Sequence, residues 1–422
     1  CLRMVRAMSC VCAFVSMSCP AGVCVCVLSD CAMCTYPAAP PLPHQVCQSL
    51  QTGDGERVGE SCAVLREISV VADFPRPEVR DRAALAVLQY ITSSAGLLAP
   101  FFSPDGGDER VAHEICNSLV SLASHEAPLV ASPQHCSVEF FQLLLSCTQQ
   151  RPRRIASLTF DVWISLADIP VVERHAYVSG EVFQVLLHNL LASIAYPADF
   201  SSSWDESADD EDDLSEFRDN KHGIQDVLLV CAYALDATFF EILEKQIVGA
   251  TAVVNGAVVV QDCWRLEAVL YVLHQAMEAV KSSVNSKDKC GTALSFLVRT
   301  VQLLLAEGVQ GACALHPELQ DTVCVLLGSL TFLLTSGSKR LEPEQPGNAE
   351  KAAIGAHFVS ALSFLFKCLP HLSCCGSAAK AVHQLCIHGQ KALTASAAEG
   401  VGGEPLVFAL VEATITALDS SL

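Results

Sequence analysis

Residues 152–168 read Pro-Arg-Arg-Ile-Ala-Ser-Leu-Thr-Phe-Asp-Val-Trp-Ile-Ser-Leu-Ala-Asp, which is the pattern of an amphipathic helix. Four apolar residues recur at helical spacing and form one stripe: Ile155, Leu158, Val162 and Leu166. Pro152 suits the first turn, where a backbone N–H has no partner inside the helix. The same pattern returns many times along the chain, so this stretch is one unit of a series.

From about Gly59 onward, amphipathic helical segments follow one another with turn signals between them. They cover residues 76–92, 109–124, 137–148, 152–168, 171–194, 215–234, 263–284, 290–305, 317–334, 351–369, 376–394 and 406–418. Helix pairs recur at roughly 40–47 residues, the period of HEAT and armadillo arrays. Because one pair cannot bury its own apolar face, neighbouring pairs must stack. The sequence therefore predicts an all-α fold, a HEAT/armadillo-like α-solenoid of antiparallel helix pairs over residues 58–422.

Two alternatives bound this prediction. A compact all-α bundle is the second architecture, and the length of the chain disfavours it because single cores stop growing at about 250–300 residues. Residues 250–260 are the one β-like piece, with valine-rich arms on either side of Asn255-Gly256. Asn-Gly between two such arms predicts a small β-hairpin.

The composition limits the classes of partner. The chain has 422 residues, is 51% hydrophobic and carries a net charge of −20. So acidic a protein lacks the basic face that binding a nucleic-acid backbone requires. The charge instead suits basic partners.

The 22 cysteines are distributed unevenly, with nine in residues 1–47 and the rest placed singly on apolar faces. Buried free cysteine behaves as a small hydrophobe, so we expect reduced thiols and a cytoplasmic or nuclear protein. Residues 1–57 are predicted to be a disordered or spurious Cys/Pro-rich extension. Cys10–Leu28 loosely resembles a signal peptide, which leaves open a secreted or membrane-linked protein. Pro20 and Gly22 interrupt that stretch, so no membrane insertion is expected.

Residues 201–214 are predicted to form an acidic loop, after which Ser215 would cap the next helix. Its charges repel one another, so the segment cannot fold onto itself, and it offers a multivalent surface to a basic partner. The candidate partner-binding residues are Asp205, Glu206, Asp209, Asp210, Glu211, Asp212, Asp213 and Glu216. The alternative is a solvated loop that only keeps the protein soluble.

The sequence contains no phosphate-binding glycine loop, dinucleotide fingerprint or nucleophile elbow, so we expect no catalysis and no cofactor. One dense Cys/His group occurs near the C-terminal end, and it lacks a Cys-x-x-Cys pair. We interpret it as helix-packing thiols with surface histidines rather than as a metal site. Its members are Cys368, Cys374, Cys375, His383, Cys386 and His388.

Four segments in order resemble the importin-β superfamily, and within it the transportin-SR and importin-thirteen branch. The first is Ile155–Leu166, where Phe160 and Trp163 match and Val162 stands where that branch often has Phe. The second is the acidic run that ends in Glu216-Phe217-Arg218, and the third is Trp264–Leu273. The fourth is Ala378–Cys386. The aromatic residues in these segments are expected to be core.

The resemblance covers roughly residues 109–395 and implies a nuclear transport receptor that moves between cytoplasm and nucleus. Such receptors bind basic or Arg/Ser-rich protein cargo on a concave solenoid surface, pass nucleoporins and release cargo to Ran GTPase in its GTP form. Residues 1–47 do not resemble the amino-terminal repeats that this branch uses for much of Ran binding, so the resemblance implies a central fragment. The alternative function is a HEAT-repeat scaffold for a cytosolic complex that Ran does not control.

Overall fold

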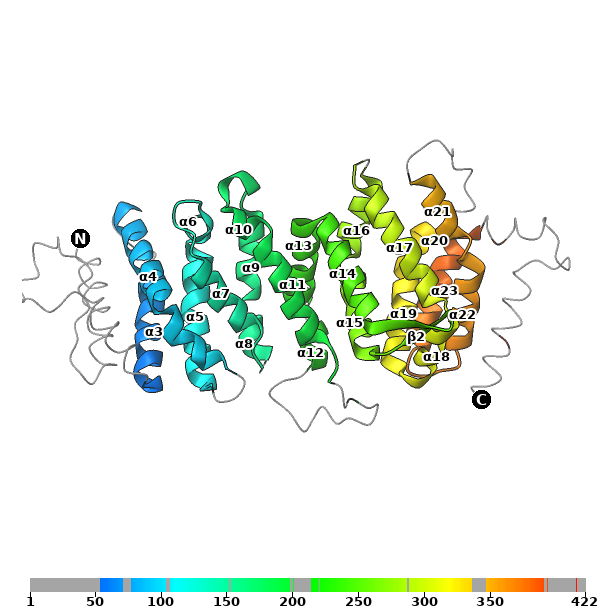
Figure 1. The fold of residues 1–422 in the computed structure, drawn as a ribbon, viewed down its shortest axis with the longest axis horizontal. Helices are drawn as coiled ribbons and strands as arrows, with labels where there is room; N and C mark the ends of the chain where they lie inside the picture. The colour runs from blue at the N-terminus through cyan, green and yellow to red at the C-terminus, as the bar shows by residue number, and fades with distance from the viewer. Residues whose placement is uncertain are drawn as a thin grey trace, which may run out of the picture. The chain divides into compact units, whose positions relative to one another are not determined.

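The computed structural model describes residues 54–70, 77–103, 107–151, 153–197, 200, 214–219, 221–286, 288–335 and 347–390, with 393 and 415. Within these ranges the chain is all-α apart from one two-stranded hairpin, as predicted (Figure 1). It divides into two compact units. Unit one takes the described residues up to Gln150 together with Ile169–His175, and unit two takes the remainder.

Unit one is built from five α-helices and two short 3-10 turns: α3 (Gly55–Val70), α4 (Pro77–Leu98), η1 (Ala99–Phe102), α5 (Glu109–His125), α6 (Ala127–Ala131), α7 (Val138–Thr148) and η2 (Val171–Glu173). Helix α3 packs on α5, and α4 packs on α7. The Asp108 carboxylate accepts hydrogen bonds from backbone N–H groups in the first turn of α5. The Ser137 hydroxyl accepts one from the first turn of α7. These caps explain why both helices begin within one residue of their predicted starts.

One segment of unit one, Arg80–Phe102, is long and apolar enough to cross a membrane by length and composition alone. Core helices of soluble proteins meet the same test. Helix α4 packs against α3, α5 and α7 within this unit, and Val87, Leu88 and Ile91 are buried there. Packing inside unit one therefore buries part of the apolar surface of α4.

Unit two begins with α8 (Arg153–Ser157), α9 (Phe160–Asp168), α10 (Ala176–Ser179), α11 (Glu181–Ile194), α12 (Leu214–Asp219), the π-helical turn η4 (Lys221–Gln225), α13 (Asp226–Leu235) and α14 (Ala237–Ala250). Strands β1 (Thr251–Val254) and β2 (Ala257–Val260) follow. The rest is α15 (Cys263–Gln275), α16 (Met277–Asn285), α17 (Cys290–Leu304), α18 (Glu307–Leu315), α19 (Pro317–Ser329), α20 (Thr331–Leu334), α21 (Asn348–Gly355), α22 (Phe358–Cys368) and α23 (Cys375–His388).

The helices of unit two contact one another in two series. Helices α11, α15, α19 and α23 pack in succession, each on the next. In the second series α13 packs on α16, α14 on α17, and α17 on α21. Segments far apart in the sequence thus become neighbours, and their apolar faces are buried between the series.

Several predicted helices are divided in the structure. The predicted helix at 263–284 breaks at Ala276 into α15 and α16, and that at 317–334 breaks at Leu330 into α19 and α20. The predicted helix at 152–168 breaks at Leu158-Thr159, where the Thr159 hydroxyl donates to the Ala156 carbonyl. The prediction missed α3, α6, α14 and α18. The predicted helix at 406–418 lies outside the described residues except for Ile415.

The predicted hairpin is confirmed. Strands β1 and β2 pair antiparallel, with Val253 opposite Val258. Asn255 and Gly256 form the turn with φ of 53° and 82°, the left-handed values that Asn-Gly hairpin turns use. The hairpin packs on α18, and there Gly308 lies so close to β2 that a Cβ atom would overlap the Val258 carbonyl oxygen.

Gly308→Ala should therefore displace β2 from α18 and lower the free energy of unfolding by about 1–3 kcal/mol. Gly311→Ala in the same helix is the control, because no atom lies within 4 Å of its added Cβ. Helix propensity predicts a neutral or slightly stabilising effect for that change. Urea titration measures the free energy of unfolding of each variant. Hydrogen exchange of the β2 amides in the folded protein shows whether the strand is displaced. Equal effects of the two substitutions would contradict the close approach.

Candidate partner-binding site around the acidic segment

The candidate acidic residues are divided between described and undescribed parts of the chain. Asp205, Glu206 and Asp209–Asp213 lie outside the described residues. Glu216 is described and stands exposed on α12. The structure therefore shows how the segment 201–213 is joined to the fold at each end, at Phe200 and at Leu214.

An aromatic cluster surrounds the chain just before the acidic segment. The rings of Tyr196 and Phe200 are 4.4 Å apart, and each lies 5.2 Å from the ring of Trp264 on α15. Trp264 also packs edge-on to His316, with 5.1 Å between ring centroids. Since ring pairs at these separations add to the energy of burial, Phe200 is held against α15.

Helix α12 returns the chain from the acidic segment to the core. Leu214, Phe217 and Arg218 are all buried. The Phe217 ring lies 5.6 Å from that of Phe160 on α9, and the Arg153 guanidinium lies 5.9 Å from the Phe217 ring centroid. Two predicted boundaries are therefore wrong by one residue. Leu214 belongs to the helix rather than the loop, and Ser215 is inside the helix rather than its cap, because burial of Leu214 starts the helix earlier.

Arg218 and Glu267 form a buried ion pair at this point. The Arg218 guanidinium nitrogens lie 3.1 and 2.5 Å from the two carboxylate oxygens of Glu267 on α15, a two-point arrangement. The side chains are only 8% and 1% exposed. The Thr322 hydroxyl on α19 donates to the same carboxylate at 2.7 Å. Each charge is thus matched and hydrogen-bonded inside the fold.

Two tyrosines complete the surroundings of Arg218. Its guanidinium lies 4.7 Å from the ring centroid of Tyr196 and 4.1 Å from that of Tyr271, at the range of cation–π attraction. The Tyr271 hydroxyl donates to the Arg218 carbonyl. Burial by itself would lower the pKa of Arg218, but the charge and hydrogen bonds of Glu267 outweigh it and raise that pKa. Arg218 is therefore a permanent cation.

The ion pair and the aromatic cluster together hold both ends of the acidic segment against α15. Tyr196 precedes the segment and contacts Arg218, which follows it. We name Tyr196, Phe200, Arg218, Trp264 and Glu267 the anchor. Sequence analysis missed the pairing of Arg218 with Glu267. The available signal was a single charge at Glu267 within the apolar run Leu266–Leu273.

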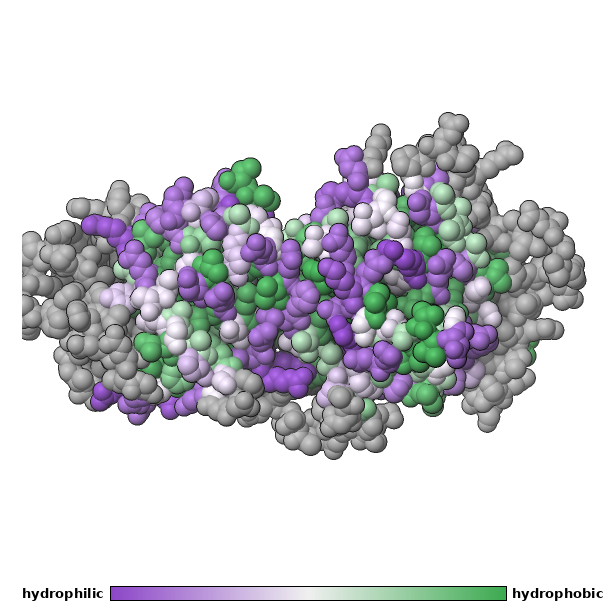
Figure 2. Space-filling model, viewed as in Figure 1, coloured by the Kyte–Doolittle hydropathy of each residue, from purple (hydrophilic) through white to green (hydrophobic). Residues whose placement is uncertain are grey.

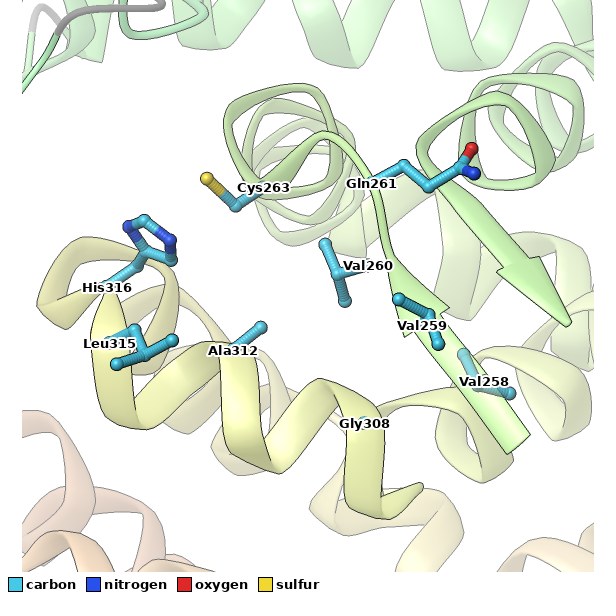
Figure 3. Close-up of a pocket in the computed structure, with 9 residues that line it drawn as sticks. All are labelled: Val258, Val259, Val260, Gln261, Cys263, Gly308, Ala312, Leu315 and His316. Carbon is cyan, nitrogen blue, oxygen red and sulfur yellow. The ribbon is translucent and has the colours of Figure 1, made fainter. Parts of the chain in front are cut away.

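A shallow hollow of about 300 Å³ lies next to the anchor, between β2 and α18 (Figure 3). Apolar residues line most of it, and Gln261, Cys263 and His316 are its polar lining residues. None of its lining residues is a carboxylate, a lysine or an arginine, so the hollow has the chemistry of an apolar contact. Leu315 of its lining is exposed, as are Val253 and Val254 on the adjoining strand β1. Figure 2 shows hydrophobic surface over the hairpin and α18.

The aromatic residues of the quoted segments are core residues, as predicted. Phe160, Trp163 and Trp264 are at most 8% exposed, and Leu273 is fully buried. Trp163 packs on Phe183, and its indole N–H donates to the Thr159 hydroxyl. They position helices and offer no free surface to a partner.

Comparisons with known proteins leave the family open. No family model matches the chain, and no curated protein matches it. One solved structure similar to it is a crystal structure of an engineered protein, at 13% identity over 82% of this chain and 97% of that chain. The TM-score is 0.27, so this likeness supports no conclusion about fold or function.

Glu267→Gln should lower the free energy of unfolding by about 3–5 kcal/mol, because it leaves Arg218 buried without a counter-charge. The control is Glu244→Gln, which breaks the Arg299–Glu244 pair of 2.8 Å between side chains that are 58% and 37% exposed. Exposed pairs contribute within about 1 kcal/mol. Urea unfolding followed by tryptophan fluorescence compares the two. A loss from Glu267→Gln no larger than that of the control would show that the pair does not hold the anchor.

Proposed function

We propose that the chain is an α-solenoid of helix pairs. The two contact series of unit two support this, because α11, α15, α19 and α23 stack in order while a second series does the same. In repeat proteins each repeat contacts only the repeats next to it. Small-angle scattering of the full chain should give an elongated particle. The scattering curve of a near-spherical particle would contradict the solenoid.

We further propose that the protein is a nuclear transport receptor that binds basic or Arg/Ser-rich cargo under the control of Ran GTPase, and that it moves between cytoplasm and nucleus past nucleoporins. One observation carries this proposal: the four segments that resemble the transportin-SR and importin-thirteen branch contact one another through one network. Phe160 of the first touches Phe217 of the second, and Arg218 of the second pairs with Glu267 of the third.

The fourth segment joins the same network through α19. Thr322 of α19 donates to Glu267, and Gly328 of α19 lies against Ala381 on α23, where an added Cβ would be 3.1 Å from the Ala381 Cβ. The small side chain of Ala381 therefore lets α23 lie close to α19. The four resembling segments, which are separate in the sequence, are thus linked by contacts within unit two.

Electrostatics supports a basic partner. The chain carries a net charge of −20, and seven of its acidic residues fall within Asp205–Asp213. The anchor holds the residues at the two ends of this segment, and the apolar hollow lies next to the anchor. A cationic ligand with an apolar side chain could therefore use both, the charge for steering and the hollow for contact.

The five acidic residues Asp209–Asp213 should act together. Replacing all five with Asn and Gln in the full chain should weaken binding of an Arg/Ser-rich protein about ten- to hundred-fold at low salt. Each exposed pair contributes only about 0.2–1 kcal/mol, so single changes should have little effect. The loss should shrink at high salt because counter-ions already screen the charges. Fluorescence anisotropy at two ionic strengths measures the affinities, with and without Ran in its GTP form.

A matched control separates the local segment from overall charge. It replaces five exposed glutamates on helices of both units with Gln: Glu60, Glu181, Glu241, Glu278 and Glu307. Both variants change the net charge by the same amount. If the two lose affinity equally, the acidic segment has no specific role. If cargo binds but Ran·GTP does not displace it, the scaffold function replaces the transport function.

A further inference from the structure

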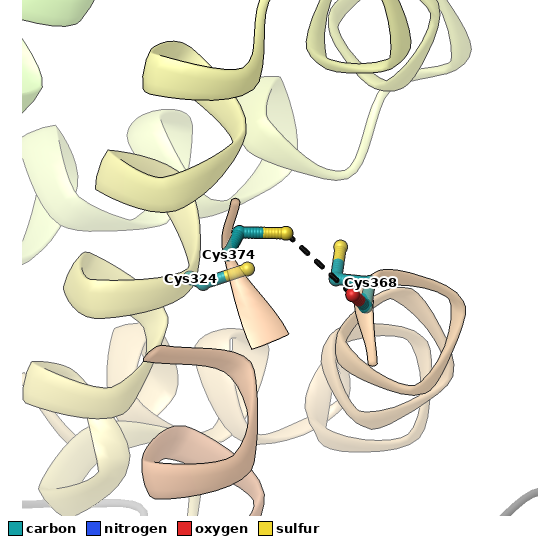
Figure 4. A group of neighbouring side chains, drawn as sticks. All are labelled: Cys324, Cys368 and Cys374. Atoms are coloured by element: carbon teal, nitrogen blue, oxygen red, sulfur yellow. Dashed lines mark hydrogen bonds between the residues drawn. The ribbon is translucent and has the colours of Figure 1, made fainter. Parts of the chain in front are cut away.

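Three cysteine thiols converge inside unit two. Cys324 lies on α19, Cys368 ends α22 and Cys374 precedes α23 (Figure 4). Their sulfur atoms all lie within 4.8 Å of one another, and all three residues are at most 1% exposed. We name them the thiol cluster. The structure leaves Cys375, His383, Cys386 and His388 of the sequence-predicted Cys/His group outside it.

The backbone holds the thiol cluster in place. The turn between α22 and α23 is closed by hydrogen bonds from the His371 N–H to the Cys368 carbonyl at 3.0 Å and from the Cys374 N–H to the His371 carbonyl at 3.1 Å. Cys324 comes from a neighbouring helix that packs on both α22 and α23. Three separate elements therefore present sulfur to one point.

A helix amino end and one side-chain hydrogen-bond donor lie next to the thiol cluster. Cys374 is the N-cap residue of α23, a helix of 14 residues whose amino end carries positive partial charge. The Gln320 side-chain amide donates to the Cys368 sulfur at 3.3 Å. Anionic sulfur is the form that binds metals.

The separations suit a metal ion. Metal–sulfur bonds of about 2.3 Å place the sulfur atoms of a shared ion about 3.7–4.0 Å apart. Small side-chain rotations would bring the sulfur atoms from their observed separations, all within 4.8 Å, to these shorter values. Soft thiolate ligands select zinc(II) and copper(I) over the hard cations magnesium and calcium.

We propose that Cys324, Cys368 and Cys374 form a binding site for one thiophilic d¹⁰ cation, zinc(II) or copper(I). Each ligating thiol gives its proton to solvent as the metal–sulfur bond forms, and no electron is transferred. The Gln320 amide is a positioning group that orients Cys368. The bound ion ties α19, α22 and α23 together, so it stabilises this end of unit two. This site is independent of the proposed cargo binding.

Cadmium(II) is the probe for the test, since its bonds to thiolates give a charge-transfer absorption band. The full chain is used with the nine cysteines of residues 1–47 changed to serine, so that they do not compete. One equivalent of cadmium should produce a saturable band. Zinc(II) and copper(I) added separately should remove it, and the ion that does so at the lower free concentration is the preferred one. Cys324→Ala and Cys374→Ala should each weaken binding at least about a hundred-fold.

The matched control is Cys231→Ala, which removes a buried free thiol on α13 outside the cluster. It should bind cadmium as the parent does. Equal loss in Cys231→Ala, or no saturable band in the parent, would overturn the site. If the cluster variants do not fold, X-ray absorption spectroscopy of the zinc-loaded parent identifies the atoms bound to the zinc ion. Three sulfur neighbours at about 2.3 Å support the site, and a shell of nitrogen and oxygen overturns it.

Discussion

The ion pair of Arg218 and Glu267 is shielded from water, so neither charge could remain there without the other. Removing two charges from water is costly, and the geometry offsets that cost because both charges are paired and hydrogen-bonded. The carboxylate receives both guanidinium bonds and the Thr322 hydroxyl, while Tyr196 and Tyr271 cover the cation. These contacts hold α12, α15 and α19 in one arrangement. The acidic segment leaves from this point and returns to it.

The helices of this fold were largely predictable because their apolar periodicity is local. Glu109–His125 and Val138–Thr148 agree with the prediction within one residue, since Asp108 and Ser137 mark their starts. The breaks at Ala276 and Leu330 were not predictable. The apolar stripe continues across each break, so the bend depends on the helices packed against it. A pattern in one helix carries no information about its neighbours.

The site was predictable to the same extent. Its acidic residues are visible as a charge run, and the hairpin beside it is encoded by Asn255-Gly256. The partner of Arg218 was not, because nothing local connects it to a glutamate on α15. Cys324 was missed for the same reason. It is far from Cys368 in sequence and becomes its neighbour only when α19 stacks on α22. Chemistry that depends on stacking cannot be derived from spacing along the chain.

Hydrogen–deuterium exchange of the full chain with an Arg/Ser-rich peptide tests the central claim, that the anchor and the acidic segment bind a basic partner together. The peptide is compared with a neutral peptide of equal length at low salt. If the claim holds, the basic peptide slows exchange in residues 196–219 and in α15, which carries Trp264 and Glu267 of the anchor, and the neutral peptide does not. Slower exchange elsewhere with none in these residues would contradict it.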